Sequence, residues 1–194
     1  MGAMHESLAT AGQIDGDTAA SRDAFIGNMR CVANAVSVVT TDGAAGRHGA
    51  TVSAFCSVSA DPPTVLVCLK TDSRIARLVK ANGVLALNVL GAEQSPLAVR
   101  FAGGEDASLT AVQGRSDGVC DRFVGVALDA RFSQPVLTGA IGFCGVVRQM
   151  HDAGSHTVCI AEVEALAQSD AQPLVYHDGG YQRIAPVAQE PQHG

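Results

Sequence analysis

Short apolar runs bounded by turn residues recur along the chain and predict a fold built mainly from β-strands. The early runs are rich in Val and Leu and end at Gly, Pro, Asn or Asp, as buried strands do. Later runs come in pairs that a tight turn joins, at 152–155 and at 178–180. The predicted strands are 36–41, 49–52, 64–69, 84–90, 141–150, 156–166, 174–177 and 181–184. Because hairpins connect most of them, we expect a mostly antiparallel β-barrel rather than a parallel, doubly wound sheet.

Three segments have helical spacing instead, so we expect a few short helices beside the barrel. The first covers 23–34, where apolar residues recur every three or four positions and Asp23 can cap the start. The second follows a cap at Asp72 or Ser73 and ends at an Asn-Gly pair, which is a common helix stop. The third covers 94–102.

One stretch, 49–63, combines a strand pattern with many hydroxyl groups. Val52, Ala54 and Phe55 alternate in part with Thr and Ser, so a strand here buries one face and presents hydroxyls and backbone amides on the other. Two consecutive prolines end the run, because proline lacks the amide proton that a β-ladder needs. Taken alone, the stretch also fits an ordinary strand followed by a proline turn.

Length and composition indicate one domain with polar ends. At 194 residues and 19.8 kDa the chain can bury a sizeable core, and 47% hydrophobic with 4% aromatic residues indicates an interior of small aliphatic side chains. We expect an N-terminal tail over 1–22, a single domain over 23–185 and a C-terminal tail over 186–194. The Gly- and Ser-rich segment 103–119 is expected to be a surface loop.

Charge and motif patterns argue against several classes of function. Thirteen basic and nineteen acidic residues give a net charge of −6 without a block of Lys or Arg, which argues against a nucleic-acid partner. No apolar run reaches the ~18 residues of a membrane span, and no secretory leader opens the chain, so we expect a cytoplasmic protein without membrane contact. The six cysteines form no Cys-x-x-Cys pair, the histidines lack metal-ligand spacing, and no Gly-x-Gly-x-x-Gly motif is present. Zinc, redox-dithiol and Rossmann sites therefore lack support.

Short motifs follow one another in a characteristic order between residues 24 and 184. The main ones are Val38-Val39-Thr40-Thr41, Gly49-Ala50-Thr51-Val52-Ser53-Ala54-Phe55, Ser57-Val58-Ser59-Ala60-Asp61-Pro62-Pro63, Asn88-Val89-Leu90, Arg100-Phe101-Ala102, Asp121-Arg122-Phe123, Pro135-Val136-Leu137-Thr138-Gly139-Ala140, Gly154-Ser155-His156 and Gly180-Tyr181. Their number and order resemble the short-chain flavin reductase family, the small reductase components of two-component aromatic monooxygenases. The resemblance implies a split β-barrel of the FMN-binding type that dimerises and holds flavin near the dimer interface. It also implies that NADH or NADPH reduces FMN or FAD, and that the reduced flavin then diffuses to an oxygenase.

Such a reaction needs a shaped groove more than a strong nucleophile, because the two cofactors carry the hydride chemistry themselves. The protein must hold the rings at near-attack distance and stabilise charge at the N1–C2=O edge of the flavin. The resemblance assigns residues to the parts of the flavin. They are Thr51, Val52, Ser53 and Ala54 at that edge, Ser57, Ser59 and Asp61 on the ribityl side, Cys68 as a further flavin-binding residue, and Lys70, Ser73 and Arg74 at the phosphate.

Several of these assignments have a plainer structural alternative. Ser57 and Ser59 can instead cap the end of a strand, because Ser readily bonds local backbone. Lys70 and Arg74 can be solvated surface charges, which are the norm for Lys and Arg. Many relatives have Asn at the position of Lys70, although a cation there is compatible with phosphate. Ser73, at a helix start with unpaired amides, is physically suited to an anion.

His156 is the candidate that the resemblance places near the nicotinamide. Its imidazole can orient the carboxamide or change protonation with pH, whereas a lone His beside a turn is otherwise polar surface. The family has Gly five residues later, where this chain has Ala161, whose methyl group narrows the pocket. Tyr181 either covers the flavin or nicotinamide or packs within its hairpin. Arg100 and Phe101 lie near the phosphate end or have a packing role.

We interpret the chain as an NADH-dependent flavin reductase, acting as a homodimer, that supplies reduced flavin to a phenol-type monooxygenase. FAD is the first choice of flavin and FMN the second, and NADH is favoured over NADPH because no Arg cluster is poised for a 2′-phosphate. Two alternatives stay open. One is a split-barrel oxidase with tightly bound FMN, and the other is a flavin-binding carrier module without turnover.

Overall fold

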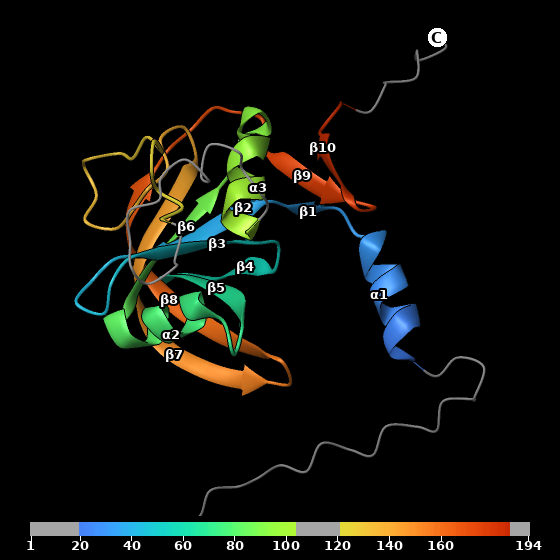
Figure 1. Cartoon of the computed structure of the whole chain (residues 1–194), viewed down its shortest axis with the longest axis horizontal. Coiled ribbons are helices and arrows are strands. Elements are labelled where there is room, and N and C mark those ends of the chain that lie inside the picture. Colours follow the sequence, from blue (N-terminus) through green and yellow to red (C-terminus); the bar gives the residue numbers. More distant parts are fainter. Residues whose placement is uncertain (1–19, 104–120, 187–194) are drawn as a thin grey trace, which may run out of the picture.

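The computed structural model describes residues 20–103 and 121–186, and its strands form two antiparallel sheets (Figure 1). A seven-stranded sheet forms the body of the molecule, and a three-stranded sheet lies beside it. The elements in chain order are α1 (Arg22–Arg30), β1 (Asn34–Ala35), β2 (Ser37–Thr41), β3 (His48–Val52), β4 (Phe55–Ala60), β5 (Pro63–Lys70), α2 (Arg74–Asn82), β6 (Val84–Val89), the 3₁₀ turn η2 (Ala92–Gln94), α3 (Ser95–Ala102), β7 (Ile141–Ala153), β8 (His156–Ala167), β9 (Leu174–His177) and β10 (Gly180–Arg183).

The large sheet curls into a barrel that is split along one side. Its strand order is β3-β2-β6-β7-β8-β5-β4, so β3 and β4 are its two edges. These edges are consecutive in the chain and are joined by Ser53 and Ala54 alone, which brings the two ends of the sheet together. The amide of Cys68 in β5 donates to the carbonyl of Ala54 at 2.9 Å, which fixes this crossing. The antiparallel split barrel expected from the sequence is confirmed.

The sequence pattern of 49–63 suggested a single strand, and this prediction was wrong. β3 ends at Val52, β4 begins at Phe55, and β5 already begins at Pro63. The run breaks because β3 pairs with β2 on one side of the split while β4 pairs with β5 on the other. Other strands follow the prediction more closely, although β7 and β8 extend it and leave Gly154 and Ser155 as their turn.

The core has two main parts, and β2 lies between them. Inside the barrel, every second residue of β5 packs with the apolar face of α2 and with Val39 of β2. On the other side of β2, Val38 packs under α3 in a second cluster that includes Phe101 and Leu137. Because both of its faces are covered, β2 is buried along its whole length.

A buried polar network anchors the segment that follows residue 134. The side-chain amide of Asn88 donates to the carbonyl of Val38 at 3.1 Å, and its oxygen accepts from the amide of Leu137 at 2.9 Å. Thr40 donates its hydroxyl proton to the carbonyl of Pro135 at 2.6 Å. A buried amide keeps its place only when such bonds are made, so Asn88 has a structural role in holding this segment on the barrel.

The first helix differs from its prediction, whereas the second begins at one of the two predicted caps. Ser21, rather than Asp23, caps α1, since its hydroxyl oxygen accepts from the amide of Ala24 at 3.1 Å. This helix also ends at Arg30, short of the predicted residue 34, because β1 pairs there with β9. Ser73 caps α2, and Gly83 ends it with a left-handed φ of 71°. The loop expected at 103–119 lies almost wholly outside the described residues.

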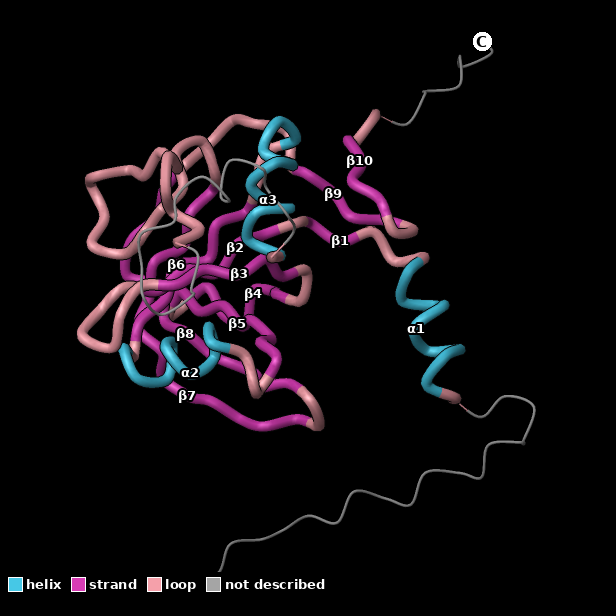
Figure 2. Tube along the Cα trace, in the orientation of Figure 1, coloured by secondary structure: helices cyan, strands magenta, loops and turns pink. Residues whose placement is uncertain are grey.

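The small sheet, of order β1-β9-β10, carries α1 away from the barrel (Figure 2). This helix buries none of its residues. Within the described residues, the structure contains no helix long and apolar enough to cross a membrane.

Candidate functional site

The crossing between β3 and β4 lies exposed at the split of the barrel. Ser53 and Ala54 are both exposed, whereas Thr51 and Val52 before them are half-buried. The hydroxyl of Thr51 donates to the carbonyl of Ala98 at 2.7 Å, so it fixes α3 on β3. The backbone of Ser53 and Ala54 is thus accessible, and the strand that precedes it is held in place by α3. This arrangement suits the approach of a flat ring.

The serines of β4 lie on the exposed edge of the sheet, and one of them is already bonded locally. Ser59 donates its hydroxyl proton to the carbonyl of Asp61 at 2.9 Å and accepts from the amide of Asp61 at 3.1 Å. This is the turn-forming role that Ser often has, and the register of the β4–β5 pair shifts between Ser57 and Ser59. Ser57 and Asp61 are exposed, so their polar groups face outward from the barrel.

The start of α2 gathers positive charge and helix amides. Ser73 caps the helix by accepting from the amide of Ala76 at 3.2 Å, and its hydroxyl donates to the carbonyl of Lys70. Lys70 and Arg74 are both exposed at this end. The N-terminus of a helix is favourable for an anion, so this end of the site fits a phosphate group.

His156 lies beside this same end. It pairs with Lys70 across β8 and β5, and the carbonyl of Ser155 accepts from the amide of Thr71 at 3.1 Å. The ring is exposed, and its Nδ1 is 2.9 Å from the hydroxyl oxygen of Ser155. Within one copy, the candidate for the nicotinamide therefore stands next to the candidates for the phosphate.

The predicted residues thus spread along β5 rather than cluster at one point. Ser59 pairs with Thr64 near the start of β5, Ala54 bonds Cys68, and His156 pairs with Lys70 at its end. Lys70 lies six positions after Thr64 along the strand, which is roughly 20 Å. The site is an elongated strip along the edge of the sheet.

Cys68 lies in the middle of this strip as a protonated thiol. It is half-buried, and burial, followed by the neighbouring Cys56, raises its pKa. A thiol that stays protonated is a poor nucleophile, so this residue offers apolar surface to a ligand. No group of His, Cys, Asp and Glu that could hold a metal ion is found among the described residues.

Arg100 and Phe101 make packing contacts between α3 and the segment that follows residue 120. Phe101 is fully buried and meets Phe123 edge-on, with ring centroids 5.1 Å apart. Arg100 donates through Nη1 to the carbonyl of Val124 at 2.9 Å. The two residues hold the segment 121–126 against α3, and a ligand has no access to the ring of Phe101 in this structure. The sequence pattern does not reveal this, because the contacts join residues more than 20 positions apart.

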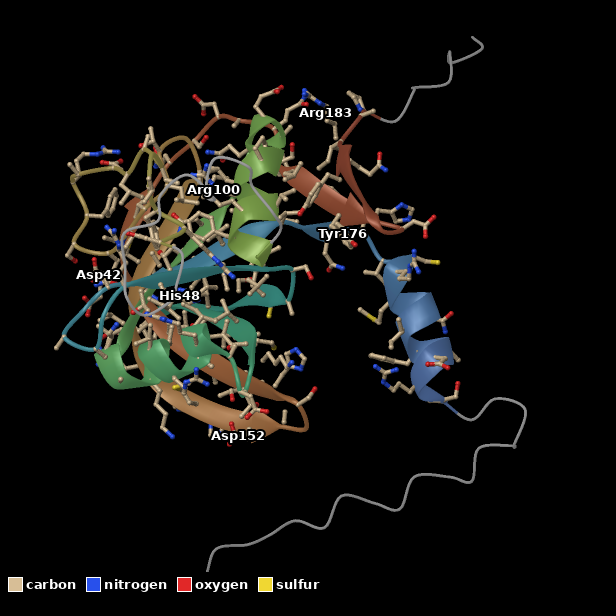
Figure 3. All side chains as sticks on the ribbon, in the orientation of Figure 1. Asp42, His48, Arg100, Asp152, Tyr176 and Arg183 are labelled. Atoms are coloured by element: carbon tan, nitrogen blue, oxygen red, sulfur yellow. The ribbon has the colours of Figure 1, made fainter. Side chains whose placement is uncertain are left out.

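Tyr181 lies on the small sheet and is not brought together with the strip within one copy. Its ring is half-buried against the second core cluster and meets Tyr176 edge-on, with centroids 5.7 Å apart. Burial, with a smaller contribution from Tyr176, raises the pKa of its hydroxyl. These contacts pack Tyr181 within its own hairpin, whose Tyr176 is labelled in Figure 3.

His48 was not among the predicted site residues, yet it borders the start of α2. Burial, followed by the charges of Arg122 and Arg74, lowers its pKa to about 4, and Asp121 opposes them. The ring is therefore neutral at physiological pH and lies near two positive charges. Figure 3 marks the position of His48 on the barrel. In the sequence, only its position directly before Gly49, at the start of the candidate flavin segment, could have indicated that His48 borders the site. Nothing in the local pattern indicates that Arg74 and Arg122 lie close to it.

Comparison with known proteins decides the family of this barrel. The family model described as "Flavin reductase like domain" matches residues 29–185, which is most of the chain. The chain belongs to the flavin reductase family.

Similar proteins agree with the family over nearly the whole chain. "FMN reductase (NADH) RutF 2" of Methylorubrum extorquens (strain PA1) is 39% identical, over 87% of this chain and 92% of that protein. The "4-hydroxyphenylacetate 3-monooxygenase reductase component" of Pseudomonas aeruginosa PAO1 is 34% identical, over 84% of this chain and 92% of that protein. The solved structure of the Streptomyces globisporus C-1027 NADH:FAD oxidoreductase SgcE6 superposes with a TM-score of 0.73 at 26% identity, covering 92% of this chain and all of that one.

All the candidate site residues lie within the matched flavin reductase region, from Thr51 to Tyr181. Most of α1, from Arg22 to Asn28, precedes it.

Proposed function

We propose that this chain is an NADH:flavin oxidoreductase that transfers hydride from NADH to FAD or FMN and releases reduced flavin to a monooxygenase component. One observation carries this proposal, namely that similarity to a protein named as an NADH-dependent FMN reductase runs through the whole barrel at 39% identity. The similarity to a monooxygenase reductase component, at 34% identity, supports the oxygenase as the recipient of the reduced flavin.

The geometry fits a reaction in which the protein positions the flavin and the nicotinamide, and these two molecules carry out the chemistry. Reduced nicotinamide supplies the hydride, and flavin accepts it. The exposed backbone at Ser53 and Ala54 approaches the ring edge, while Lys70, Ser73 and Arg74 hold the phosphate with helix amides and positive charge. His156 orients the nicotinamide from the β7–β8 turn. No residue in this scheme acts as a nucleophile, in keeping with the protonated thiol of Cys68.

Flavin acts here as a substrate, and both flavins are expected to work. A similar protein is named as an FMN reductase, and a similar structure is that of an NADH:FAD oxidoreductase. FAD remains the preferred flavin in this proposal. We place the reaction in the cytoplasm, as expected for an enzyme that draws on NADH and passes reduced flavin to an oxygenase.

The test is NADH oxidation followed by absorbance, with no flavin, FAD or FMN added in turn to the purified protein. Turnover that requires added flavin is the expected result, and the ratio of kcat/KM for the two flavins measures the preference. A yellow protein that oxidises NADH without added flavin would instead indicate the oxidase type with bound FMN. Flavin binding without NADH oxidation would indicate a carrier module, and either result would overturn the proposal.

A further inference from the structure

The β7–β8 hairpin carries His156 at an end that the barrel does not cover. Residues 151–156 are all exposed. The pairing of β6 with β7 stops at Val146, so residues 147–153 of β7 have β8 as their single neighbouring strand. An exposed hairpin end opens easily unless further contacts hold it. A fixed position of His156 therefore requires such contacts.

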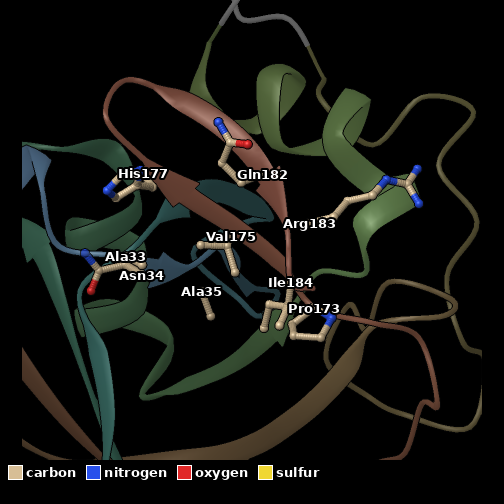
Figure 4. A pocket seen from close by; sticks show the side chains of 9 residues that line it. All are labelled: Ala33, Asn34, Ala35, Pro173, Val175, His177, Gln182, Arg183 and Ile184. Carbon is tan, nitrogen blue, oxygen red and sulfur yellow. The ribbon is translucent and has the colours of Figure 1, made fainter. Parts of the chain in front are cut away.

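The groove beside the small sheet does not supply them. It has a volume of about 710 Å³, and its lining residues lie within 33–35, 173–177 and 182–184 (Figure 4). None of the candidates for flavin or nicotinamide is among these residues. The contacts that matter to His156 lie instead where the hairpin meets the end of β5.

Thr157 is buried at this place and bonds two other segments. It is 5% exposed, in contrast to the six residues before it. Its hydroxyl donates to Oδ1 of Asp152 across the hairpin at 2.7 Å, and Figure 3 marks Asp152. A hydroxyl has a single proton, so Thr157 accepts in turn from the hydroxyl of Thr71, whose oxygen lies 3.1 Å away. The two bonds form a chain from the end of β5 through β8 to β7.

Thr71 lies in the turn proposed to hold the flavin phosphate. It stands between Lys70 and Ser73, and the amide of Ser73 donates to the carbonyl of Lys70 at 2.9 Å, which closes the turn. The amide of Thr71 also donates to the carbonyl of Ser155 at 3.1 Å. One backbone bond and the chain of hydroxyls therefore tie the phosphate turn to the turn that carries His156.

His156 and Thr157 lie on opposite faces of β8, because successive side chains of a strand alternate. His156 pairs with the exposed Lys70, whereas Thr157 pairs with Leu69, which is buried in the barrel core. A ligand at His156 therefore does not reach the hydroxyl of Thr157. Thr157 acts on such a ligand through the position of its neighbour.

We propose that Thr157 is a positioning residue that aligns His156 for the nicotinamide, and that a flavin phosphate bound at the turn 70–74 strengthens this alignment. The phosphate restrains Thr71, and the hydroxyl chain and the backbone bond to Ser155 pass this restraint to the hairpin. The nicotinamide then meets a hairpin that is already ordered, which lowers the entropic cost of its binding. This role rests on the flavin reductase function proposed above.

The first test compares three variants by the steady-state kinetics of NADH oxidation with FMN. Thr157→Val removes the hydroxyl and should raise the KM for NADH about two- to tenfold, while the KM for FMN should change less than about twofold. Thr157→Ser keeps the hydroxyl and should behave like the wild type. Thr41→Val is the matched control, because the buried hydroxyl of Thr41 bonds Val84 and Asn82 at the far end of α2. The control should leave both KM values unchanged. An unchanged KM for NADH in Thr157→Val, or an equal rise in the control, would overturn the proposal.

Two further variants test the link without relying on the buried position. Asp152→Ala removes the exposed end of the hydroxyl chain, so the fold should persist and the KM for NADH should rise in the same direction. In a His156→Ala background, Thr157→Val should raise the KM for NADH no further, since the ring that it positions is gone. A wild-type KM in Asp152→Ala, or an additive effect in the double variant, would contradict positioning through His156.

Riboflavin, which lacks the phosphate, tests the role of the phosphate turn. In the wild type the KM for NADH should be about fivefold higher with riboflavin than with FMN. In Thr157→Val the two flavins should give the same KM. Equal values in the wild type, or a difference that persists in Thr157→Val, would overturn the link.

Titration of NAD⁺ into protein saturated with FMN or riboflavin, followed by flavin fluorescence, gives the same comparison without turnover. A wild type that binds NAD⁺ more tightly with FMN than with riboflavin, but does not oxidise NADH, would overturn the proposed function and keep the link. A wild type that oxidises NADH and binds NAD⁺ equally with both flavins would overturn the link and keep the proposed function.

Discussion

At the scale of single residues, the surroundings of His48 set its charge and make stability depend on pH. Its pKa is lowered to about 4 by burial and by the nearby Arg122 and Arg74. The unfolded chain protonates this residue near pH 6.5. Between these values the unfolded state binds more protons, so the free energy of unfolding falls as the pH falls from about 6.5 towards 4.

We expect wild type to lose about 1 kcal/mol more unfolding free energy than His48→Gln between about pH 7 and pH 4.5, less than the full shift implies because solvent screens a partly exposed ring. Urea unfolding at the two pH values measures this difference. Equal pH dependence in both proteins would show that the ring is not held neutral by its surroundings.

His156 tests the binding role of an exposed side chain. Loss of one hydrogen bond to the nicotinamide is worth about 0.5–1.5 kcal/mol, so His156→Ala should raise the KM for NADH by up to about tenfold. The KM for flavin should change less than twofold. Steady-state kinetics with each substrate varied in turn gives both values. Since His156 lies beside Lys70, a larger effect on flavin would place the ring at the phosphate instead.

Because Gly49 has no side chain, α3 can pack closely against β3 at this position. A Cβ atom there would lie 2.6 Å from Cε1 of Phe101, so the ring rests directly on the backbone of β3. We expect Gly49→Ala to destabilise the fold by about 1–3 kcal/mol through overpacking. Gly27→Ala, in open space on α1, should be neutral or stabilising because Ala favours helix. Thermal unfolding of both variants measures whether the two changes in stability have these opposite directions.

At the scale of elements, the caps of α1 and α2 form a natural comparison. Ser21 and Ser73 each accept from the amide three residues on, at 3.1 and 3.2 Å. Replacing either by Ala should cost about 1 kcal/mol of stability at its own helix. Ser73→Ala should also raise the KM for FMN several-fold, whereas Ser21→Ala should not. An unchanged KM in both would remove the start of α2 from the flavin site.

The sequence predicts those elements whose signals are local. The apolar runs of β2, β5 and β6 and the cap of α2 were all placed within about two residues, because periodicity and capping act over short spans. The break at Ser53 and Ala54 was missed, since it depends on which distant strands pair with β3 and β4. The candidate site residues came from the resemblance of the motif order to a family, and their roles stay predictions. The burial of Phe101 and the setting of His48 arise from contacts between segments far apart in the chain.

At the scale of the whole molecule, the homodimer expected from the sequence makes stability depend on concentration. Each tenfold dilution of a folded dimer lowers its stability by about 1.4 kcal/mol per dimer, because unfolding releases two chains. This is about 0.7 kcal/mol per chain, which for a chain of this length corresponds to a fall in Tm of about 1–3 °C. We expect wild type to show this fall at each tenfold step when Tm is measured over a hundredfold range of concentration. A Tm that dilution does not change would contradict the homodimer, because the unfolding of a monomer releases only one chain and does not depend on its concentration.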